Sequence, residues 1–95
     1  MTPEKRVKIK VRKILEEYNA YYVMPVTSGY GNSGAPDFLV CFRGKFWGIE
    51  CKAGRGEPTQ LQLANLAAIT DCGGIALIIN ESNIDSLVQE FRKYD

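Results

Sequence analysis

The sequence of 95 residues contains no histidine. The absence of an imidazole excludes serine-histidine-aspartate triads, histidine-ligated metal centres and imidazole general bases. If the chain is catalytic, its chemistry has to come from carboxylates, lysines, hydroxyl groups and a metal ion. Places where acidic and basic side chains converge therefore carry most of the functional information.

Cysteine is scarce and irregularly placed. Cys41, Cys51 and Cys72 are odd in number, and they lie far apart in apolar strands or at a helix end. Such a pattern predicts neither a disulfide framework nor a zinc site. We expect all three to be reduced residues of the hydrophobic core.

Long hydrophobic segments are also missing. The chain has no apolar run of ~18 or more residues, and its N-terminus lacks the charged and then hydrophobic pattern of a signal peptide. These features predict a soluble intracellular protein with no membrane association, either cytoplasmic or a viral or phage protein in its host cell. The length predicts a single domain, 1–95, without room for a separate module that recognises a target.

The net charge is only +1, but the basic residues are unevenly distributed. Six of the twelve fall within nine consecutive positions: Lys5, Arg6, Lys8, Lys10, Arg12 and Lys13. Because salt screens charges beyond ~10 Å, a polyanion responds to such a local patch more than to the net charge. A solvated helix face explains the cluster equally well.

Hydrophobic periodicity and turn residues predict the order helix, three strands, helix, strand and helix. The helices are expected at about 3–19, 59–72 and 82 or 83–94, and the strands at 21–26, 38–42, 46–49 with its continuation to Lys52, and 75–79. The continuous apolar run 75–79 is typical of a buried parallel strand. The sequence therefore predicts an α/β protein with a central mixed four-stranded sheet flanked by helices.

One stretch brings charged side chains to a common point. Two apolar runs flank Arg43-Gly44-Lys45, which predicts an antiparallel hairpin. Asp37 begins the first strand, and Glu50 and Lys52 end the second, so closing the hairpin brings all three to one end of the sheet. Adjacent carboxylates repel each other unless a cation lies between them, and their oxygens suit Mg²⁺ or Mn²⁺. The alternative is an ordinary charged strand end.

At these positions the sequence resembles the PD-(D/E)xK nuclease superfamily and, within it, the virus-type replication-repair nuclease domains known as VRR-NUC. The resemblance rests on Gly34-Ala35-Pro36-Asp37-Phe38, on Glu50-Cys51-Lys52, and on Thr59 and Gln62 ahead of a helix that ends at Gly73-Gly74. It spans nearly the whole chain and implies a restriction-endonuclease-like αβββαβ core, here with an extra C-terminal helix. The element order predicted from periodicity agrees with that core.

The resemblance also implies roles for individual residues. Asp37, Glu50 and the backbone carbonyl of Cys51 are expected to bind Mg²⁺ or Mn²⁺. Lys52 is expected to orient or deprotonate the nucleophile, or to stabilise the transition state. Glu4 matches an acidic residue that completes the site in the family, but a carboxylate there also complements the helix dipole.

The remaining expected site residues are a glutamine and several DNA contacts. Gln62 matches a residue of the family's site, and Gln60 is its nearest competitor. The residues expected to contact DNA are Lys8, Arg12, Lys13, Tyr30, Arg43, Lys45 and Arg55. Arg43, Lys45 and Arg55 are expected around the acidic site, and Tyr30 either stacks on a base or only forms part of a long connection.

The implied activity is that of a metal-dependent endonuclease that hydrolyses phosphodiester bonds in DNA. Stand-alone members of the family resemble Holliday-junction resolvases. Cutting both strands of a symmetric four-way junction needs two active sites, so we expect branched DNA as the substrate and a C₂ homodimer as the active form. The alternatives are a catalytically silent DNA-binding module of the same fold, and a nuclease that prefers flaps, nicks or linear duplex.

Overall fold

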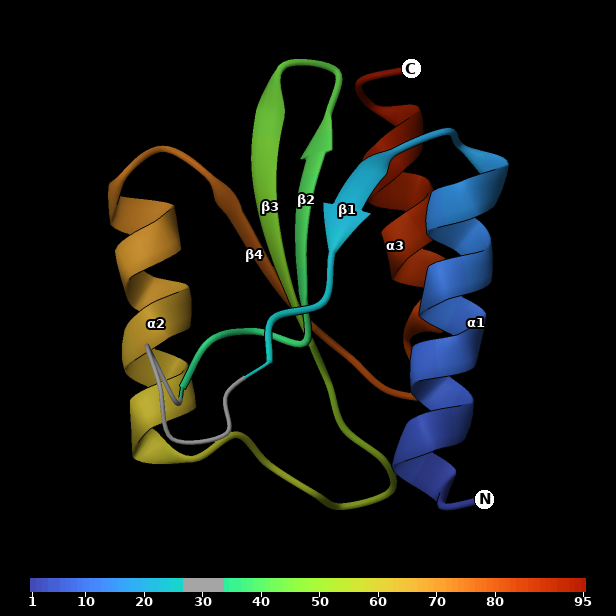
Figure 1. Cartoon of the computed structure of the whole chain (residues 1–95), viewed down its shortest axis with the longest axis vertical. Coiled ribbons are helices and arrows are strands. Elements are labelled where there is room, and N and C mark those ends of the chain that lie inside the picture. Colours follow the sequence, from blue (N-terminus) through green and yellow to red (C-terminus); the bar gives the residue numbers. More distant parts are fainter. Residues whose placement is uncertain (27–33) are drawn as a thin grey trace.

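The computed structural model describes residues 1–26 and 34–95. In chain order its elements are α1 (Pro3–Glu17), β1 (Tyr21–Val23), β2 (Phe38–Phe42), β3 (Lys45–Cys51), α2 (Gln60–Asp71), β4 (Ile75–Ile79) and α3 (Ile84–Arg92). The strands form one sheet in the order β1-β2-β3-β4. Helices α1 and α3 lie against one face of the sheet and α2 covers the other, which gives three layers (Figure 1).

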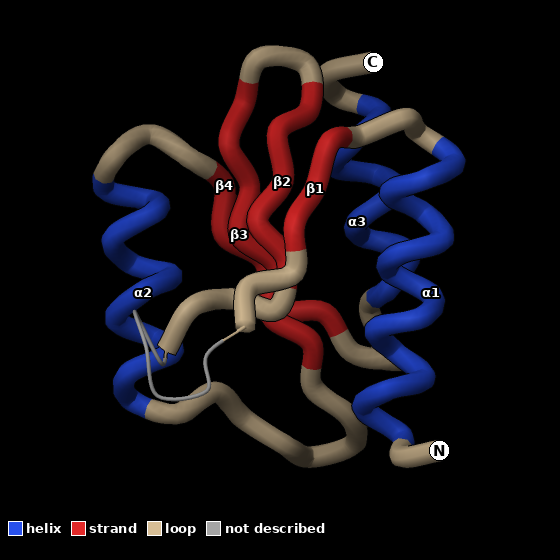
Figure 2. Tube along the Cα trace, viewed as in Figure 1, coloured by secondary structure: helices blue, strands red, loops and turns tan. Residues whose placement is uncertain are grey.

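The sheet is mixed. Strand β2 pairs antiparallel with β1 and with β3, whereas β3 and β4 are parallel (Figure 2). Parallel neighbours need a crossover connection, and α2 provides it. The predicted α/β fold, with a four-stranded mixed sheet, an αβββαβ core and an extra C-terminal helix, is therefore confirmed.

The hydrophobic core lies between the sheet and the pair α1 and α3. Burial alternates along β2, where Phe38, Val40 and Phe42 point into this layer. From α3, the Phe91 ring stacks on Phe42 with a centroid distance of 4.3 Å and meets Trp47 edge-on at 4.8 Å. These rings join α3 to both strands of the β2-β3 hairpin.

Helix α2 is held against the opposite face by a close approach to β3. Ile69 packs directly over Gly48, and a Cβ atom at that position would collide with the isoleucine Cδ1. The glycine thus lets the helix lie close to the strand. Leu66 is buried beneath α2, whereas Leu61 and Leu63 on the same helix remain exposed.

The hairpin turn consists of two residues, Arg43 and Gly44, with φ of 52° and 76°. Two central residues with positive φ define a type I′ turn, which matches the twist of the flanking strands. Lys45, predicted to belong to the turn, is the first residue of β3. The Arg43 guanidinium forms an ion pair with Asp95 at 2.7 Å, which connects the turn to the C-terminal residue.

Three of the predicted elements extend too far at their C-terminal ends. Helix α1 ends at Glu17 because Asn19 adopts the left-handed conformation, with φ of 56°. Strand β1 ends at Val23, two residues before Pro25, which has no N–H for strand pairing. The last helix ends at Arg92 rather than 94. None of the helices in the described ranges has the length and apolar character needed to cross a membrane.

The expectation that all three cysteines are core residues is wrong for two of them. Cys51 is buried, but Cys41 and Cys72 are exposed. Cys41 lies between the buried Val40 and Phe42, so the alternation of the strand turns it outward. Cys72 follows the last residue of α2 and is its C-cap.

Candidate active site

The β2-β3 register places two carboxylates opposite each other. Phe38 pairs with Ile49, and continuing this antiparallel register by one residue sets Asp37 opposite Glu50. The backbone N–H of Cys51 donates a hydrogen bond of 2.8 Å to Asp37 Oδ2. This bond fixes the Asp37 side chain across the end of the hairpin, as the strand pattern predicts.

Glu50 is 2% exposed, and its two oxygens have different surroundings. Oε2 lies 3.5 Å from Lys52 Nζ. Oε1 is buried and has no hydrogen-bond partner among the residues that the structure describes. Burial and the nearby charge of Asp37 raise the pKa of Glu50 from 4.5 to about 7, against the opposing effect of Lys52.

Lys52 is fixed by the parallel half of the sheet. Its backbone N–H donates to the Ile79 carbonyl at 2.9 Å, which extends the β3-β4 pairing beyond Cys51. Its side chain is 15% exposed and lies on the same side of the strand as Glu50. Asp37, Glu50 and Lys52 therefore converge as the sequence predicts.

A second lysine enters the site from α1. Lys8 Nζ lies 3.3 Å from Asp37 Oδ1 and 3.8 Å from Glu4 Oε2. Partial burial lowers the pKa of Lys8, but the pairing with Asp37 and the charge of Glu4 outweigh burial and raise it. From the sequence, Lys8 is expected only to contact DNA. The four-residue spacing from Glu4, which puts both on one helix face, is the signal that could have placed it here.

The donor atoms suit a hard divalent cation. Asp37 and Glu50 provide carboxylate oxygens, and the unpartnered Glu50 Oε1 is an acceptor for which a cation is a natural partner. Within residues 1–26 and 34–95, no three acidic, cysteine or histidine side chains form a group that could hold a metal. Lys8 lies between Glu4 and Asp37. The residues present therefore fit a metal bound by two carboxylates, a backbone oxygen and water, which is a mixed ligand set that Mg²⁺ commonly accepts.

Gln62 has a structural contact in this protein. Its Oε1 accepts a hydrogen bond of 2.9 Å from the backbone N–H of Thr59, and its own backbone N–H donates to Thr59 Oγ1 at 3.2 Å. The two residues form a capping box at the start of α2. Gln60 is the first residue of that helix and is exposed.

Two basic residues lie far from the acidic site, contrary to expectation. Arg43 occupies the hairpin turn and Lys45 is next to it, whereas Asp37 and Glu50 lie at the other end of the strands. Glu50 lies six positions after Gly44, which corresponds to roughly 20 Å along an extended strand. In Figure 1 the turn is at the top of the sheet, and the connection from β3 to α2 runs along the bottom. The expectation is wrong because the turn and the acidic residues lie at opposite ends of the same two strands, so their closeness in sequence does not make them close in space.

Among the other residues expected to contact DNA, Arg12 on α1 contacts side chains outside the acidic site. Arg12 Nε donates to Tyr22 Oη at 3.0 Å and lies 3.4 Å from Glu16 Oε2, so it joins α1 to β1. Lys13 is exposed. Tyr30 lies outside the described residues.

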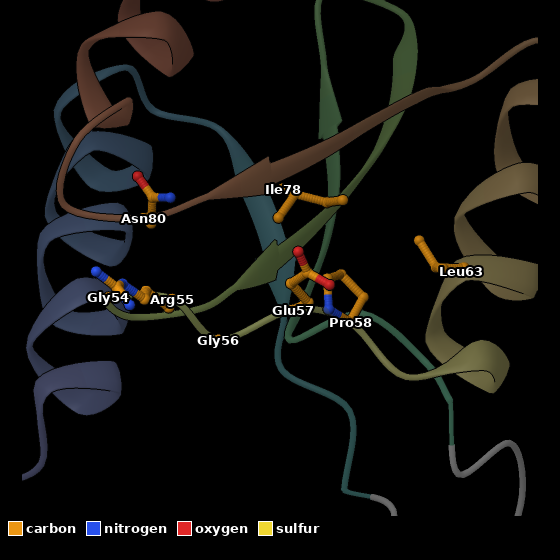
Figure 3. Close-up of a pocket in the computed structure, with 8 residues that line it drawn as sticks. All are labelled: Gly54, Arg55, Gly56, Glu57, Pro58, Leu63, Ile78 and Asn80. Carbon is orange, nitrogen blue, oxygen red and sulfur yellow. The ribbon is translucent and has the colours of Figure 1, made fainter.

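A pocket of about 420 Å³ lies between the loop after β3, the start of α2 and the end of β4 (Figure 3). Its walls are the loop after β3, the start of α2 and the end of β4, through Gly54, Arg55, Gly56, Glu57, Pro58, Leu63, Ile78 and Asn80. Ile78 is the β4 neighbour of Glu50 in the parallel register. The pocket therefore lies next to the strand position that carries Glu50, and its lining includes apolar residues together with Arg55 and Glu57.

Comparison with known proteins identifies the fold. The sequence matches no family model, and no curated protein is significantly similar to it. A solved structure described as a VRR_NUC domain superposes with a TM-score of 0.76 and 24% sequence identity, over 96% of this chain and 99% of that chain. This protein therefore has the fold of a VRR_NUC domain, the restriction-endonuclease-like architecture that its motifs predict.

Proposed function

We propose that this protein is a metal-dependent DNA endonuclease with Asp37, Glu50 and Lys52 at its active site. The observation that carries the proposal is Glu50 Oε1, a buried carboxylate oxygen without a partner in the described structure, on the strand opposite Asp37. Burying such a group lowers the stability of the fold, and proteins retain such groups mainly at functional sites. The nuclease-type fold supports the same conclusion.

The carboxylates and the lysine of the site have different proposed roles. Asp37 and Glu50, with the Cys51 carbonyl, would hold Mg²⁺ or Mn²⁺, and Glu4 on α1 is a further carboxylate whose charge acts on Glu50. When bound, the ion would supply Lewis acidity for the scissile phosphate and for activation of a water nucleophile. Lys52 keeps an ammonium 3.5 Å from Glu50, where it can orient that water or neutralise charge on a phosphate oxygen.

The proposed substrate is branched DNA. The chain forms one small layered unit, so selectivity is expected to depend on the shape of the DNA and on backbone contacts rather than on base sequence. The pocket in Figure 3 includes Ile78, the β4 neighbour of Glu50, and Arg55 in its lining is a candidate partner for a phosphate next to the cut. A four-way junction has two symmetric strands to cut, which favours two copies of this site.

A C₂ homodimer would supply the second site. Along and after β1, four large apolar side chains are exposed: Tyr21, Val23, Met24 and Val26. Leu61 and Leu63 of α2 are exposed as well, so the protein offers apolar surface on two sides. Either surface is suited to burial against a second copy, and the mass of the protein in solution measures the association.

The test is cleavage of a four-way junction and of a linear duplex with the same arm sequences, in Mg²⁺, Mn²⁺ or EDTA. We expect the wild type to cut the junction only with metal. Asp37→Ala is expected to lose at least roughly 10²-fold in rate, because it removes a charge that the transition state requires. Asp85→Ala, which removes an exposed carboxylate at the start of α3, serves as the control and should cut normally.

Other results would change the proposal in defined ways. Equal cutting of the duplex would keep the nuclease and discard selectivity for junctions, and preferential cutting of a flap or nick would replace the substrate. Metal-independent binding without cleavage would support the silent DNA-binding module instead.

A further inference from the structure

We propose that Lys8 is a positioning residue that acts as an internal counter-ion for Asp37, and that a divalent metal displaces it. The inference rests on the proposed metal site and goes beyond it, because it concerns how that site is filled. Its basis is one contact: Lys8 Nζ lies 3.3 Å from Asp37 Oδ1, the oxygen that the Cys51 N–H does not occupy.

The ammonium occupies the side of Asp37 that a metal needs. Asp37 Oδ2 is fixed by its hydrogen bond to the backbone, so Oδ1 is the oxygen available to an incoming cation. A Mg²⁺ ion binds carboxylate oxygen at ~2.1 Å. Lys8 Nζ and a divalent ion on the same oxygen would then lie within a few ångströms of each other, and like charges at that separation repel strongly.

Lys8 also separates the carboxylates that a metal would bring together. Its ammonium bridges Asp37 and Glu4, at 3.3 Å and 3.8 Å. The described residues accordingly contain no group of three acidic side chains arranged for a metal. Moving Lys8 away leaves Glu4, Asp37 and Glu50 facing the same region, with the Lys52 ammonium beside Glu50 as the remaining positive charge.

The side chain of Lys8 is able to leave. It is 30% exposed, and its flexible four-carbon stem starts from the first half of α1. Removal from Asp37 takes the ammonium toward solvent, where a phosphate of bound DNA provides a new partner. Metal binding would thereby free the Lys8 ammonium for DNA. Thermodynamic linkage then requires that DNA binding raise the affinity for metal by the same factor.

The experiment is calorimetric titration of Mn²⁺ and of Mg²⁺ into wild type, Lys8→Met and Lys10→Met, without DNA. Methionine keeps the length of the stem and removes the charge. Lys10 is exposed on the same helix and serves as the matched control. We expect Lys8→Met to bind Mn²⁺ about 3- to 10-fold more tightly than wild type, because the metal no longer competes with an ion pair of modest strength. Lys10→Met should bind as wild type does.

If wild type binds Mn²⁺ and Lys8→Met binds it equally or more weakly, the proposal that the metal displaces Lys8 is wrong, but the proposed metal site is retained. A second measurement separates this failure from failure of the proposed function. In EDTA, urea unfolding of Lys8→Met, Asp37→Asn and the double variant measures the coupling between the two side chains. Coupling in EDTA with no metal binding by wild type would mean that the ion pair is only structural, which overturns both proposals. Absence of coupling would overturn the counter-ion role alone.

Discussion

Glu50→Gln is expected to abolish cleavage and, in the absence of metal, to stabilise the folded protein at pH 8. The loss of activity follows from removing a metal-binding charge, and we expect at least roughly 10²- to 10³-fold. The gain in stability follows from the environment of the carboxylate. Glu50 is buried opposite Asp37, and one of its oxygens lacks a partner in the described structure. A neutral amide of the same shape removes the buried charge.

The sign of the pH dependence follows from the pKa of Glu50. Folding raises this pKa from 4.5 to about 7, through burial and then through the charge of Asp37. Between these values the folded state keeps a proton that the unfolded chain has lost. The contribution of Glu50 to the free energy of unfolding therefore declines as pH rises from about 4.5 to 7, by up to ~3 kcal/mol.

Urea unfolding in EDTA at pH 5 and at pH 8 measures this decline. Wild type should lose more stability between the two pH values than Glu50→Gln does. Glu57→Gln, which alters an exposed glutamate, should behave as wild type. Equal losses in wild type and Glu50→Gln would mean that Glu50 is ionised normally, and retention of cleavage by Glu50→Gln would remove this residue from the active site.

Phe91→Ala is expected to lower the free energy of unfolding by about 3–5 kcal/mol, the usual cost of truncating a fully buried phenylalanine. Phe91 is completely buried, stacked on Phe42 and in edge contact with Trp47 and Tyr18. These contacts join α3 to α1 and to both strands of the hairpin that carries the site. Truncation leaves a cavity at the place where the layers meet.

Phe46→Ala provides the matched control. Phe46 lies on β3 next to Trp47 but is 48% exposed, so its truncation should cost about 1 kcal/mol or less. Urea denaturation measures the free energy of unfolding of both variants. The comparison requires that the free energy fall with urea concentration at the same slope in each. Similar losses for the two variants would contradict the placement of Phe91 in the core.

The sequence was sufficient for the parts of the site that depend on local structure. The positions of Asp37, Glu50 and Lys52 follow from a short turn between two strands and from the alternation of side chains, both of which are set within 16 residues. The fold follows in the same way from periodicity, and the single parallel strand from its continuous apolar run. Local determinants agree here with the global arrangement.

What the sequence left undetermined depends on long-range packing or on competition between partners. The spacing from Glu4 puts Lys8 on the same helix face, but Lys8 meets Asp37 only because α1 docks beside the end of the sheet, and the helix sequence alone does not fix that docking. Gln62 has a capping box available within its own first turn, and this local contact competes with any role at the site. Cys41 was misjudged for another reason: cysteine was treated as a core residue, although its neighbours Val40 and Phe42 already take the inward positions.

The two-residue turn between β2 and β3 also has a kinetic consequence. Hairpins of this kind close in roughly 1–10 μs, whereas β4 reaches β3 only after the whole α2 crossover has been traversed. Asp37 directly precedes β2 and Glu50 lies on β3, so closing the hairpin brings the two carboxylates together before the parallel pairing that orders Lys52. We therefore expect the repulsion of the acidic pair to contribute to the folding barrier as well as to the energy of the final structure.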